Sequence, residues 1–398
     1  MKVLFLNAYG NGSTGRIVDS LKTECRKKGI EAISIYARET CNSPSSSVRC
    51  FNKIDFYLDA FFTRIFDNHG LNSIFNTRKI LKIIDDFAPD IIHIHNLHGY
   101  WINYRMLFKY IKENSIKIVW TFHDCWNFTG HCTHFDYIGC YKWTKECFCC
   151  PQKREYPTSF FRDESKKNYK LKKACFSKID NLIVVTPSKW LEEQVKKSFF
   201  KENAVRTINN GIDVSKFKYV NSVKRKKILS KNYSHIILAV AGDWVPKKGL
   251  SIIVEMAQMK KEWMFVIIGN IPANKDSLIK KENIMLVKRT ESIEELAEWY
   301  SCADVFVNPT LEDNYPTTNL EAIACGTPVA TFPTGGSVEI VEKTGYGIVS
   351  KEKNTSSLLV AIEKMIENMP QYGEYRELLD AKVKFREYIQ LYEEIADR

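Results

Sequence analysis

The sequence predicts an α/β protein made of two doubly wound, Rossmann-like domains that face each other across a cleft. Apolar runs typical of buried strands alternate with helical segments along both halves of the chain. In each half a strand leads into a glycine-containing loop and then a helix, at residues 10–15 and 242–249. The chain has 398 residues, a length that favours two domains of roughly 200 residues each.

Composition is typical of a soluble globular protein, with 44% hydrophobic and 26% charged residues. The net charge of +11 favours an anionic partner such as a phosphorylated substrate, an anionic membrane surface or nucleic acid. Because the chain enters an apolar strand at Val3–Leu6, we expect no cleavable signal and a cytoplasmic location. The 12 cysteines are then expected to be reduced thiols or metal ligands.

The first half contains five predicted strands, at residues 1–9, 31–36, 90–95, 117–122 and 181–186. The loop Gly10–Gly15 joins the first strand to a helix over residues 16–28, and such a loop lets a ligand approach the backbone. Its spacing departs from the dinucleotide-binding pattern, so it gives little support to a nicotinamide or flavin cofactor.

Histidines follow two of these strands. His93, His95 and His98 lie at the end of one, and His123 lies at the end of the next. Because ligands of open α/β sheets bind beyond the carboxyl ends of the strands, these side chains are candidates for ligand contact. His93 and His95 share a face by alternation, so one of them can instead be a core histidine whose hydrogen bonds are satisfied.

Residues 51–87 form a helical region in which phenylalanines alternate with cations. Two interpretations remain open here: a packed helix pair, or an amphipathic surface facing a membrane or an acceptor. Residues 153–178 are rich in lysine, which usually marks a solvated face. Together with the phenylalanines, these lysines could also seat the domain on an anionic bilayer, at ~1 kcal/mol per basic residue.

Four cysteines have the spacing C-x7-C-x6-C-x2-C: Cys132, Cys140, Cys147 and Cys150. The final C-x2-C can place two sulfur atoms on one metal ion. A structural zinc site and free thiols are the two interpretations. A catalytic zinc is not expected.

The second half begins after a lysine-rich stretch, residues 222–234, that we interpret as a linker. Its predicted strands are residues 236–241, 265–269, 284–290, 305–307 and 329–332. The final helix, residues 382–395, has Phe385, Tyr388, Leu391 and Tyr392 spaced to bury one side.

The most informative stretch is residues 304–342. The strand Val305–Val307 leads into a loop that carries Glu312 and Asp313, and a helix then begins around residues 317–319. Free N–H groups at a helix start form an anion site. Glu321, inside that helix, would repel phosphate but can bind hydroxyl groups. The pattern therefore indicates a ligand that contains both sugar and phosphate.

Asp313 and Glu321, eight residues apart, are followed by Ala322-Ile-Ala-Cys-Gly-Thr-Pro-Val329. This arrangement resembles the donor-binding signature of retaining glycosyltransferases of family 4, which have the GT-B architecture. Residues 208–217 resemble the closing signature of that family's first domain. Residues 121–151 resemble a subgroup that acts in colanic-acid and capsule biosynthesis.

The resemblance implies an acceptor-binding domain over residues 1–220, with a Cys-rich insert at 125–151. A nucleotide-sugar-binding domain would follow over residues 221–375. Residues 376–398 would cross back to the first domain. In the glycine loop of the second domain, Lys248 matches a family lysine, but Asp243 replaces the family's phosphate-binding arginine.

The resemblance also implies roles for individual residues. His95, Asp313 and Glu321 are expected to be catalytic. Donor binding is expected at Gly15, Lys247, Lys248, Arg289, Glu312, Tyr315, Thr317, Thr318 and Asn319. Acceptor binding is expected at Ser13, Thr14, His98 and His123.

The function implied is transfer of a sugar, with retention, to a glycan or polyprenyl-diphosphate-linked acceptor at the inner face of the cell membrane. A UDP-sugar is the favoured donor and a GDP-sugar the second choice. No catalytic metal is expected, since the chain has no Asp-x-Asp motif of that kind. The alternatives are a nucleotide-sugar epimerase or hydrolase and, less favoured, a basic nucleic-acid-binding protein, for which aromatic-interleaved motifs are missing.

Overall fold

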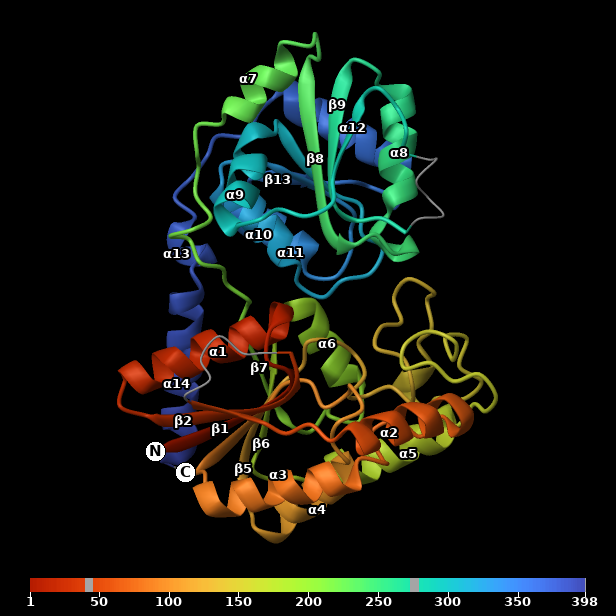
Figure 1. Ribbon diagram of the computed structural model, residues 1–398, viewed down its shortest axis with the longest axis vertical. Coiled ribbons are helices and arrows are strands. Elements are labelled where there is room, and N and C mark those ends of the chain that lie inside the picture. Colours follow the sequence, from red (N-terminus) through yellow and green to blue (C-terminus); the bar gives the residue numbers. More distant parts are fainter. Residues whose placement is uncertain (40–45, 273–278, 398) are drawn as a thin grey trace. The chain divides into compact units, whose positions relative to one another are not determined.

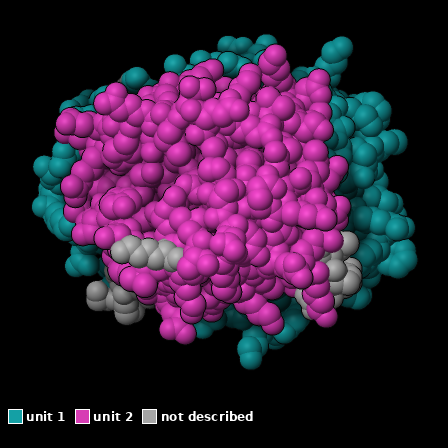
Figure 2. All heavy atoms as spheres, turned by 90° about the horizontal axis from the view of Figure 1, so that it is seen from above, with its two compact units in different colours: residues 1–208, 385–398 teal, residues 209–384 magenta. Residues whose placement is uncertain are grey.

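The computed structural model describes residues 1–39, 46–272 and 279–397. The chain forms two compact units, which Figure 2 distinguishes by colour. Unit 1 comprises Met1–Ile208 together with Phe385–Arg398, and unit 2 comprises Asn209–Lys384. The boundaries thus lie at residues 208 and 384, where the sequence had indicated 220 and 375.

Unit 1 contains a seven-stranded parallel sheet with the order β3-β2-β1-β4-β5-β6-β7. The strand order reverses between β1 and β4, which creates a topological switch point at the carboxyl ends of these two strands. The central strands β4 and β6 are buried at every residue, because helices cover both faces of a parallel sheet. The strands are β1 (Lys2–Tyr9), β2 (Glu31–Arg38), β3 (Ser47–Arg49), β4 (Ile91–Ile94), β5 (Lys117–Thr121), β6 (Leu182–Thr186) and β7 (Ala204–Thr207).

Some helices of unit 1 begin at a side chain that caps their first turn, whereas α1, α3 and α5 have no such cap. Asn103 accepts a hydrogen bond from the Met106 N–H at 3.1 Å, and Ser188 accepts one from the Leu191 N–H at 3.0 Å. The helical region expected at residues 51–87 is two helices, α2 and α3. The helices are α1 (Gly12–Lys27), α2 (Lys53–Phe66), α3 (Ile74–Phe87), α4 (Tyr104–Glu113), α5 (Ser165–Phe176), α6 (Lys189–Lys197) and α14 (Ala381–Ala396).

Helix α14 completes unit 1, although its residues come at the other end of the sequence. Its four spaced apolar residues, Phe385, Tyr388, Leu391 and Tyr392, are buried as predicted. Lys117 donates to the carbonyl groups of Ile395 and Ala396, each at 3.0 Å. A cation at this position satisfies the last carbonyl groups of the helix and complements its dipole.

Unit 2 has a second doubly wound sheet of six parallel strands, with the order β10-β9-β8-β11-β12-β13. Here the order reverses between β8 and β11, and two apolar clusters cover the two faces of the sheet. Its strands are β8 (His235–Asp243), β9 (Trp263–Asn270), β10 (Ile284–Val287), β11 (Val305–Asn308), β12 (Val329–Thr331) and β13 (Gly347–Val349).

The prediction of a linker over residues 222–234 is wrong, because this stretch contains helix α7 (Val223–Leu229). Arg225 binds Asp304 at 2.7 Å and the Cys302 carbonyl at 2.9 Å, so the basic residues here are held by unit 2. The other helices of unit 2 are α8 (Leu250–Met259), α9 (Ile293–Cys302), α10 (Thr317–Ala324), α11 (Ser337–Thr344), α12 (Thr355–Glu367) and α13 (Arg376–Leu379), with a 3-10 turn, η3 (Pro246–Lys248). Within the described ranges, every helix is too short or too polar to cross a bilayer.

Candidate active site

Two charged pairs lie at the switch point of unit 2. The Lys248 ammonium lies 2.7 Å from the Asp313 carboxylate, and the Lys247 ammonium lies 3.2 Å from Glu312. These pairs join the turn after β8 to the loop after β11, and the Leu311 N–H adds a 2.8 Å bond to the Lys247 carbonyl. The structure therefore brings together three of the predicted donor-binding residues, Lys247, Lys248 and Glu312, and the predicted catalytic residue Asp313.

The two adjacent carboxylates differ in accessibility. The Glu312 side chain is 2% exposed, and its Oε1 atom has no hydrogen-bond partner among the described residues. The Asp313 side chain is 25% exposed and faces Lys248. Of the two, Asp313 is the carboxylate that a ligand can reach directly.

Two glycines allow these loops to approach. A Cβ atom on Gly249 would lie 2.3 Å from the Pro309 carbonyl oxygen, and one on Gly335 would lie 2.0 Å from the Asp313 carbonyl oxygen. Both residues also have positive φ, at +76° and +49°. Glycine is therefore required at both positions to keep the lysine turn, the acidic loop and the start of α11 in contact.

Helix α10 begins at Thr317 with Pro316 as its N-cap and without a side-chain cap. The N–H groups of Thr317 and Thr318 lie in its first turn, where a helix offers donors to an anion. Asn319 differs, because its N–H donates to the Pro316 carbonyl at 3.2 Å. Its fully buried amide bridges Asn308 at 2.7 Å and Ser337 at 3.4 Å, so this side chain is structural.

Glu321 lies one turn into α10 and is half-buried. The Tyr300 hydroxyl, from α9, donates to its carboxylate at 2.9 Å and fixes its orientation. Burial, followed by the Glu321 charge, raises the pKa of Tyr300 well above its ordinary value, so the tyrosine remains a neutral donor.

The remaining residues that we predicted in unit 2 have different environments. Tyr315 is buried in an apolar cluster. Arg289 is exposed just beyond the carboxyl end of the edge strand β10. Asp243, which replaces the family arginine, is exposed at the end of β8, and Asn270 donates to its carboxylate at 3.2 Å.

The four histidines considered in the sequence, His93, His95, His98 and His123, lie at or just beyond the carboxyl ends of β4 and β5. Both nitrogens of His93 are bonded, to Tyr392 at 2.6 Å and to Thr121 at 2.8 Å, so His93 is the satisfied core histidine. His95 is stacked on His123, with 2.8 Å between Nδ1 and Nε2. Its Nε2 atom has no partner among the described residues. Burial lowers the pKa of His95 well below its usual value, so the ring is neutral.

His98 lies between two polar groups. Its Nε2 lies 2.8 Å from the Asp124 carboxylate and its Nδ1 lies 3.3 Å from the Tyr156 hydroxyl. Burial would raise the pKa of Asp124, but the charge and hydrogen bond of His98 outweigh it and lower the value to about 2. Asp124 therefore stays ionised and orients the His98 imidazole.

Gly15, Ser13 and Thr14 lie in the first turn of α1, close to the end of β1. A Cβ atom on Gly15 would lie 2.7 Å from the Gly10 backbone, so this glycine allows the helix to approach the strand end. Thr14 accepts a 3.3 Å bond from Asn7, and Ser13 is exposed.

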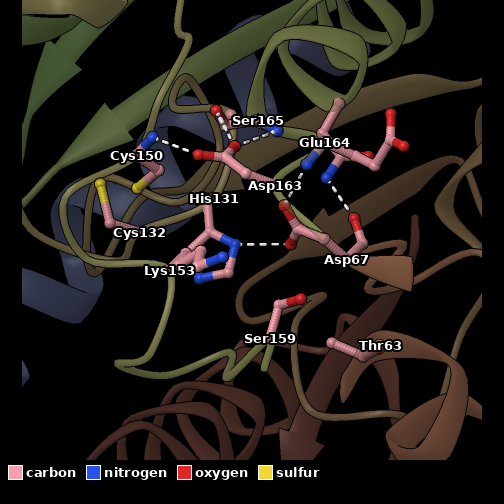
Figure 3. A network of polar contacts seen from close by, with 12 residues as sticks. Thr63, Asp67, His131, Cys132, Cys150, Lys153, Ser159, Asp163, Glu164 and Ser165 are labelled. Atoms are coloured by element: carbon pink, nitrogen blue, oxygen red, sulfur yellow. Dashed lines mark hydrogen bonds and ion pairs between the residues drawn. The ribbon is translucent and has the colours of Figure 1, made fainter. Parts of the chain in front are cut away.

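The four cysteines predicted to bind zinc do not form one ligand group. The Cys132 thiol donates to Cys150, whose pKa this bond lowers to about 7, and Figure 3 shows the two sulfur atoms together. The Cys147 sulfur instead accepts the Gly130 N–H at 3.2 Å. Across the described ranges, no three His, Cys, Asp or Glu side chains are placed to share a metal ion. The structural zinc site therefore stays a prediction.

Sequence reasoning missed Asp124, Tyr156 and Tyr300. Asp124 had a signal, since it follows His123 at a strand end. Tyr156 and Tyr300 had none, because they reach His98 and Glu321 from distant parts of the chain.

Solved structures confirm the predicted fold class. The chain aligns over 99% of its length with 98% of the sucrose-phosphate synthase of Thermosynechococcus elongatus, at a TM-score of 0.73 and 16% identity. It aligns equally far with all of Anabaena Alr3699/HepE in complex with UDP, at a TM-score of 0.69 and 13% identity. The two Rossmann-like sheets therefore belong to the GT-B class of glycosyltransferase structures.

Sequence comparison gives the family. The model of Glycosyltransferase Family 4 matches residues 14–216, about half of the chain, and that of Glycosyl transferases group 1 matches residues 234–368. The chain belongs to glycosyltransferase family 4 and is a transferase.

The chain is also similar to two curated relatives with named activities. A putative colanic acid biosynthesis glycosyl transferase, WcaC of Escherichia coli K12, is 24% identical over 70% of this chain and 68% of its own length. A Campylobacter jejuni N,N'-diacetylbacillosaminyl-diphospho-undecaprenol alpha-1,3-N-acetylgalactosaminyltransferase is 28% identical over 49% of this chain and 56% of its own.

Proposed function

We propose that this enzyme transfers a sugar, with retention, from a nucleotide-sugar to a glycan or polyprenyl-diphosphate-linked acceptor in surface polysaccharide biosynthesis. The observation that carries the proposal is the Lys248–Asp313 pair at the switch point of unit 2. It places a cation beside an accessible carboxylate where open α/β sheets bind ligands. The names of the two curated relatives support the acceptor class.

The charges suggest a role for each group in unit 2. Lys248 and the first N–H groups of α10 would bind the donor diphosphate and stabilise its leaving charge, a contribution of ~3–4 kcal/mol for a key donor. Lys248 would then exchange Asp313 for phosphate and leave Asp313 free to bind hexose hydroxyls. Glu321, oriented by Tyr300, would accept hydrogen bonds from the ribose hydroxyls.

In unit 1 we assign the hexose to His95 and the acceptor to His98 and His123. The Nε2 atom of His95 has no partner among the described residues, and the neutral ring can orient a hydroxyl group by accepting its hydrogen bond. We propose a metal-independent reaction in the cytoplasm with a UDP-sugar as donor. A fold relative solved with UDP supports that choice of base.

The test is donor turnover in Glu321→Ala and Lys248→Ala, with the exposed Lys351→Ala of the same unit as control. We expect donor turnover to fall roughly a hundredfold in each site variant and to stay unchanged in the control. Wild-type rates in both site variants would refute the assignment. An incubation with donor alone separates the alternative, since an epimerase or hydrolase would release product without acceptor.

A further inference from the structure

Helix α2 has its polar side inward and its apolar side outward. Its buried residues include Asp55, Asp59 and Thr63. Its exposed residues recur at the spacing of one helical face and are mostly apolar: Ile54, Tyr57, Leu58 and Phe61. A surface helix normally has the opposite arrangement, and clustered exposed apolar side chains mark interaction sites.

The inward side is fixed by hydrogen bonds, so α2 cannot rotate to bury its apolar face. Asp59 accepts bonds from Ser73 at 2.8 Å and Asn72 at 3.1 Å. At the end of the helix, Asp67 binds His131 at 2.6 Å and accepts the Glu164 N–H at 2.8 Å. Figure 3 shows the Asp67 carboxylate bonded both to the His131 ring and to the backbone of Glu164.

Further exposed apolar residues adjoin this face. The Phe160 N–H donates to the Arg64 carbonyl of α2 at 2.8 Å, so the exposed pair Phe160 and Phe161 lies beside the end of the helix. Ile74 and Phe75 are exposed at the start of α3, which packs against α2. We call the exposed side chains of Ile54, Tyr57, Leu58, Phe61, Ile74, Phe75, Phe160 and Phe161 the apolar face.

Along residues 53–82, which carry six of the eight side chains of the apolar face, the exposed charges have one sign. Exposed acids lie outside this range, at Asp85 and Asp86 near the end of α3 and at Asp163 beside Phe161. Between Lys53 and Lys82 all three acids, Asp55, Asp59 and Asp67, are buried. Every exposed charged residue there is a cation: Lys53, Arg64, Arg78, Lys79 and Lys82. Apolar side chains with a cationic border complement an anionic lipid surface, in which the rings enter the headgroup boundary and the cations bind phosphates.

The lysines at the start of α5 contribute less. Lys166, Lys167 and Lys170 line a shallow hollow of ≈ 360 Å³, but Asp163 and Glu164 line it too. Glu146 also pairs with Lys166 and Lys170, at 3.4 and 3.2 Å. The charge of this hollow is therefore largely balanced, and it lies outside the docking surface that we assign.

We propose that the apolar face and its cationic border dock unit 1 on an anionic bilayer. The proposal goes beyond sugar transfer and is tested without donor or acceptor, so its failure and that of the proposed function are distinguishable. The full chain is sedimented with vesicles of phosphatidylcholine and with equimolar phosphatidylcholine and phosphatidylglycerol. We expect binding to the anionic vesicles, and weaker binding in high salt.

Two double variants test the two components of this surface, the apolar side chains and the cationic border. Tyr57→Ser/Phe61→Ser should weaken binding at least about tenfold, since each ring loses apolar burial. Tyr219→Ser is the matched control, because Tyr57 and Tyr219 are both 67% exposed and Tyr219 lies in unit 2. Arg78→Gln/Lys79→Gln should also weaken binding to the anionic vesicles about tenfold or more. The control Lys280→Gln/Lys281→Gln, at an exposed pair in unit 2, should leave that binding unchanged.

Wild-type vesicle binding in both test variants would overturn the proposal, as would absence of binding in the unmodified chain. Light scattering tests the alternative that a second copy of this chain, and not a membrane, binds the apolar face. A wild-type dimer that Tyr57→Ser/Phe61→Ser converts to monomers would also overturn membrane docking. Because the substituted side chains are exposed, thermal melts should remain unchanged and exclude misfolding as the cause.

Discussion

At the scale of single residues, three histidines of unit 1, His93, His95 and His123, are unusual because they are buried and uncharged. Burial lowers the pKa of His93 and of His95 well below the ordinary value. For His123 it lowers the pKa to about 4, against a partial opposing effect of Asp124. Neutral rings can serve as both donor and acceptor, which His93 uses to bond Tyr392 and Thr121 at once.

This burial predicts that the protein loses stability at pH values well above those at which carboxylates titrate. Below about pH 6.5 the unfolded chain protonates these histidines. In the folded chain His123 does so only near pH 4, and burial also holds the pKa values of His93 and His95 well below the ordinary value. The unfolded state then binds more protons, so stability falls as pH decreases through this window, by about 1.4 kcal/mol per pH unit for each buried histidine. Urea unfolding between pH 7 and 5 measures the effect.

His93→Gln provides the control for that experiment. Glutamine keeps a donor and an acceptor but does not titrate, so the variant is expected to start less stable and to show a shallower pH dependence. Equal slopes in wild type and variant would contradict the assignment of a neutral His93.

At the scale of elements, several strands were predictable because short apolar runs have few alternatives in an α/β chain. β4, β6 and β11 lie where the runs indicated. The orientation of α2 was not predictable, because periodicity reveals an amphipathic helix without showing which face is inside. The linker prediction failed because the partners of Arg225 lie near residue 304.

The candidate site could be predicted by residue type but not by pairing. Lys248 and Asp313 are 65 positions apart and meet only because β8 and β11 are neighbours. Asn319 matched the motif, yet contacts with Asn308 and Ser337 direct its side chain into the interior. Spacing thus identified the loop, and tertiary contacts decided which groups a ligand can reach.

Gly249 gives a prediction for this pair of loops. In Gly249→Ala the new Cβ would overlap the Pro309 carbonyl, so the lysine turn must move away from the acidic loop. A shift of about 1 Å in a positioning group can reduce turnover roughly a hundredfold. Steady-state kinetics should show this loss.

Gly345→Ala separates the overlap from backbone strain. Gly345 has a φ of +60°, but no atom lies within 4 Å of its added Cβ. Both variants should lose about 1–2 kcal/mol from the left-handed conformation, whereas only Gly249→Ala should lose activity. Similar activity in the two would show that contact between the loops is unimportant.

At the scale of the whole molecule, the two units differ in how their chain ends are placed. The two ends of unit 2 meet, since the Ile212 N–H donates to the Leu379 carbonyl at 2.8 Å and the Ala381 N–H donates to Ile212 at 2.9 Å. Unit 1 instead depends on α14, a segment separated from the rest of its sequence by all of unit 2.

Fragments should therefore behave differently. Residues 209–384 are expected to fold alone with a cooperative melt. Residues 1–208 lack the buried side chains of α14, each worth about 1.5–3 kcal/mol, which together rival the stability of a whole domain. Circular dichroism should show an unstable fragment that a peptide of residues 381–397 restores. A fully stable 1–208 fragment would contradict this role of α14.

The position of α14 also has a consequence for biosynthesis. A ribosome delivers the seven strands of unit 1 before unit 2, but the tyrosines that pack against Phe5 and His93 are translated after all of unit 2. One apolar surface of the amino-terminal sheet therefore stays uncovered while about 180 further residues are synthesised at about 5–20 per second. Any chaperone that serves this protein should act on that surface, and a prematurely terminated chain should be cleared rather than accumulate.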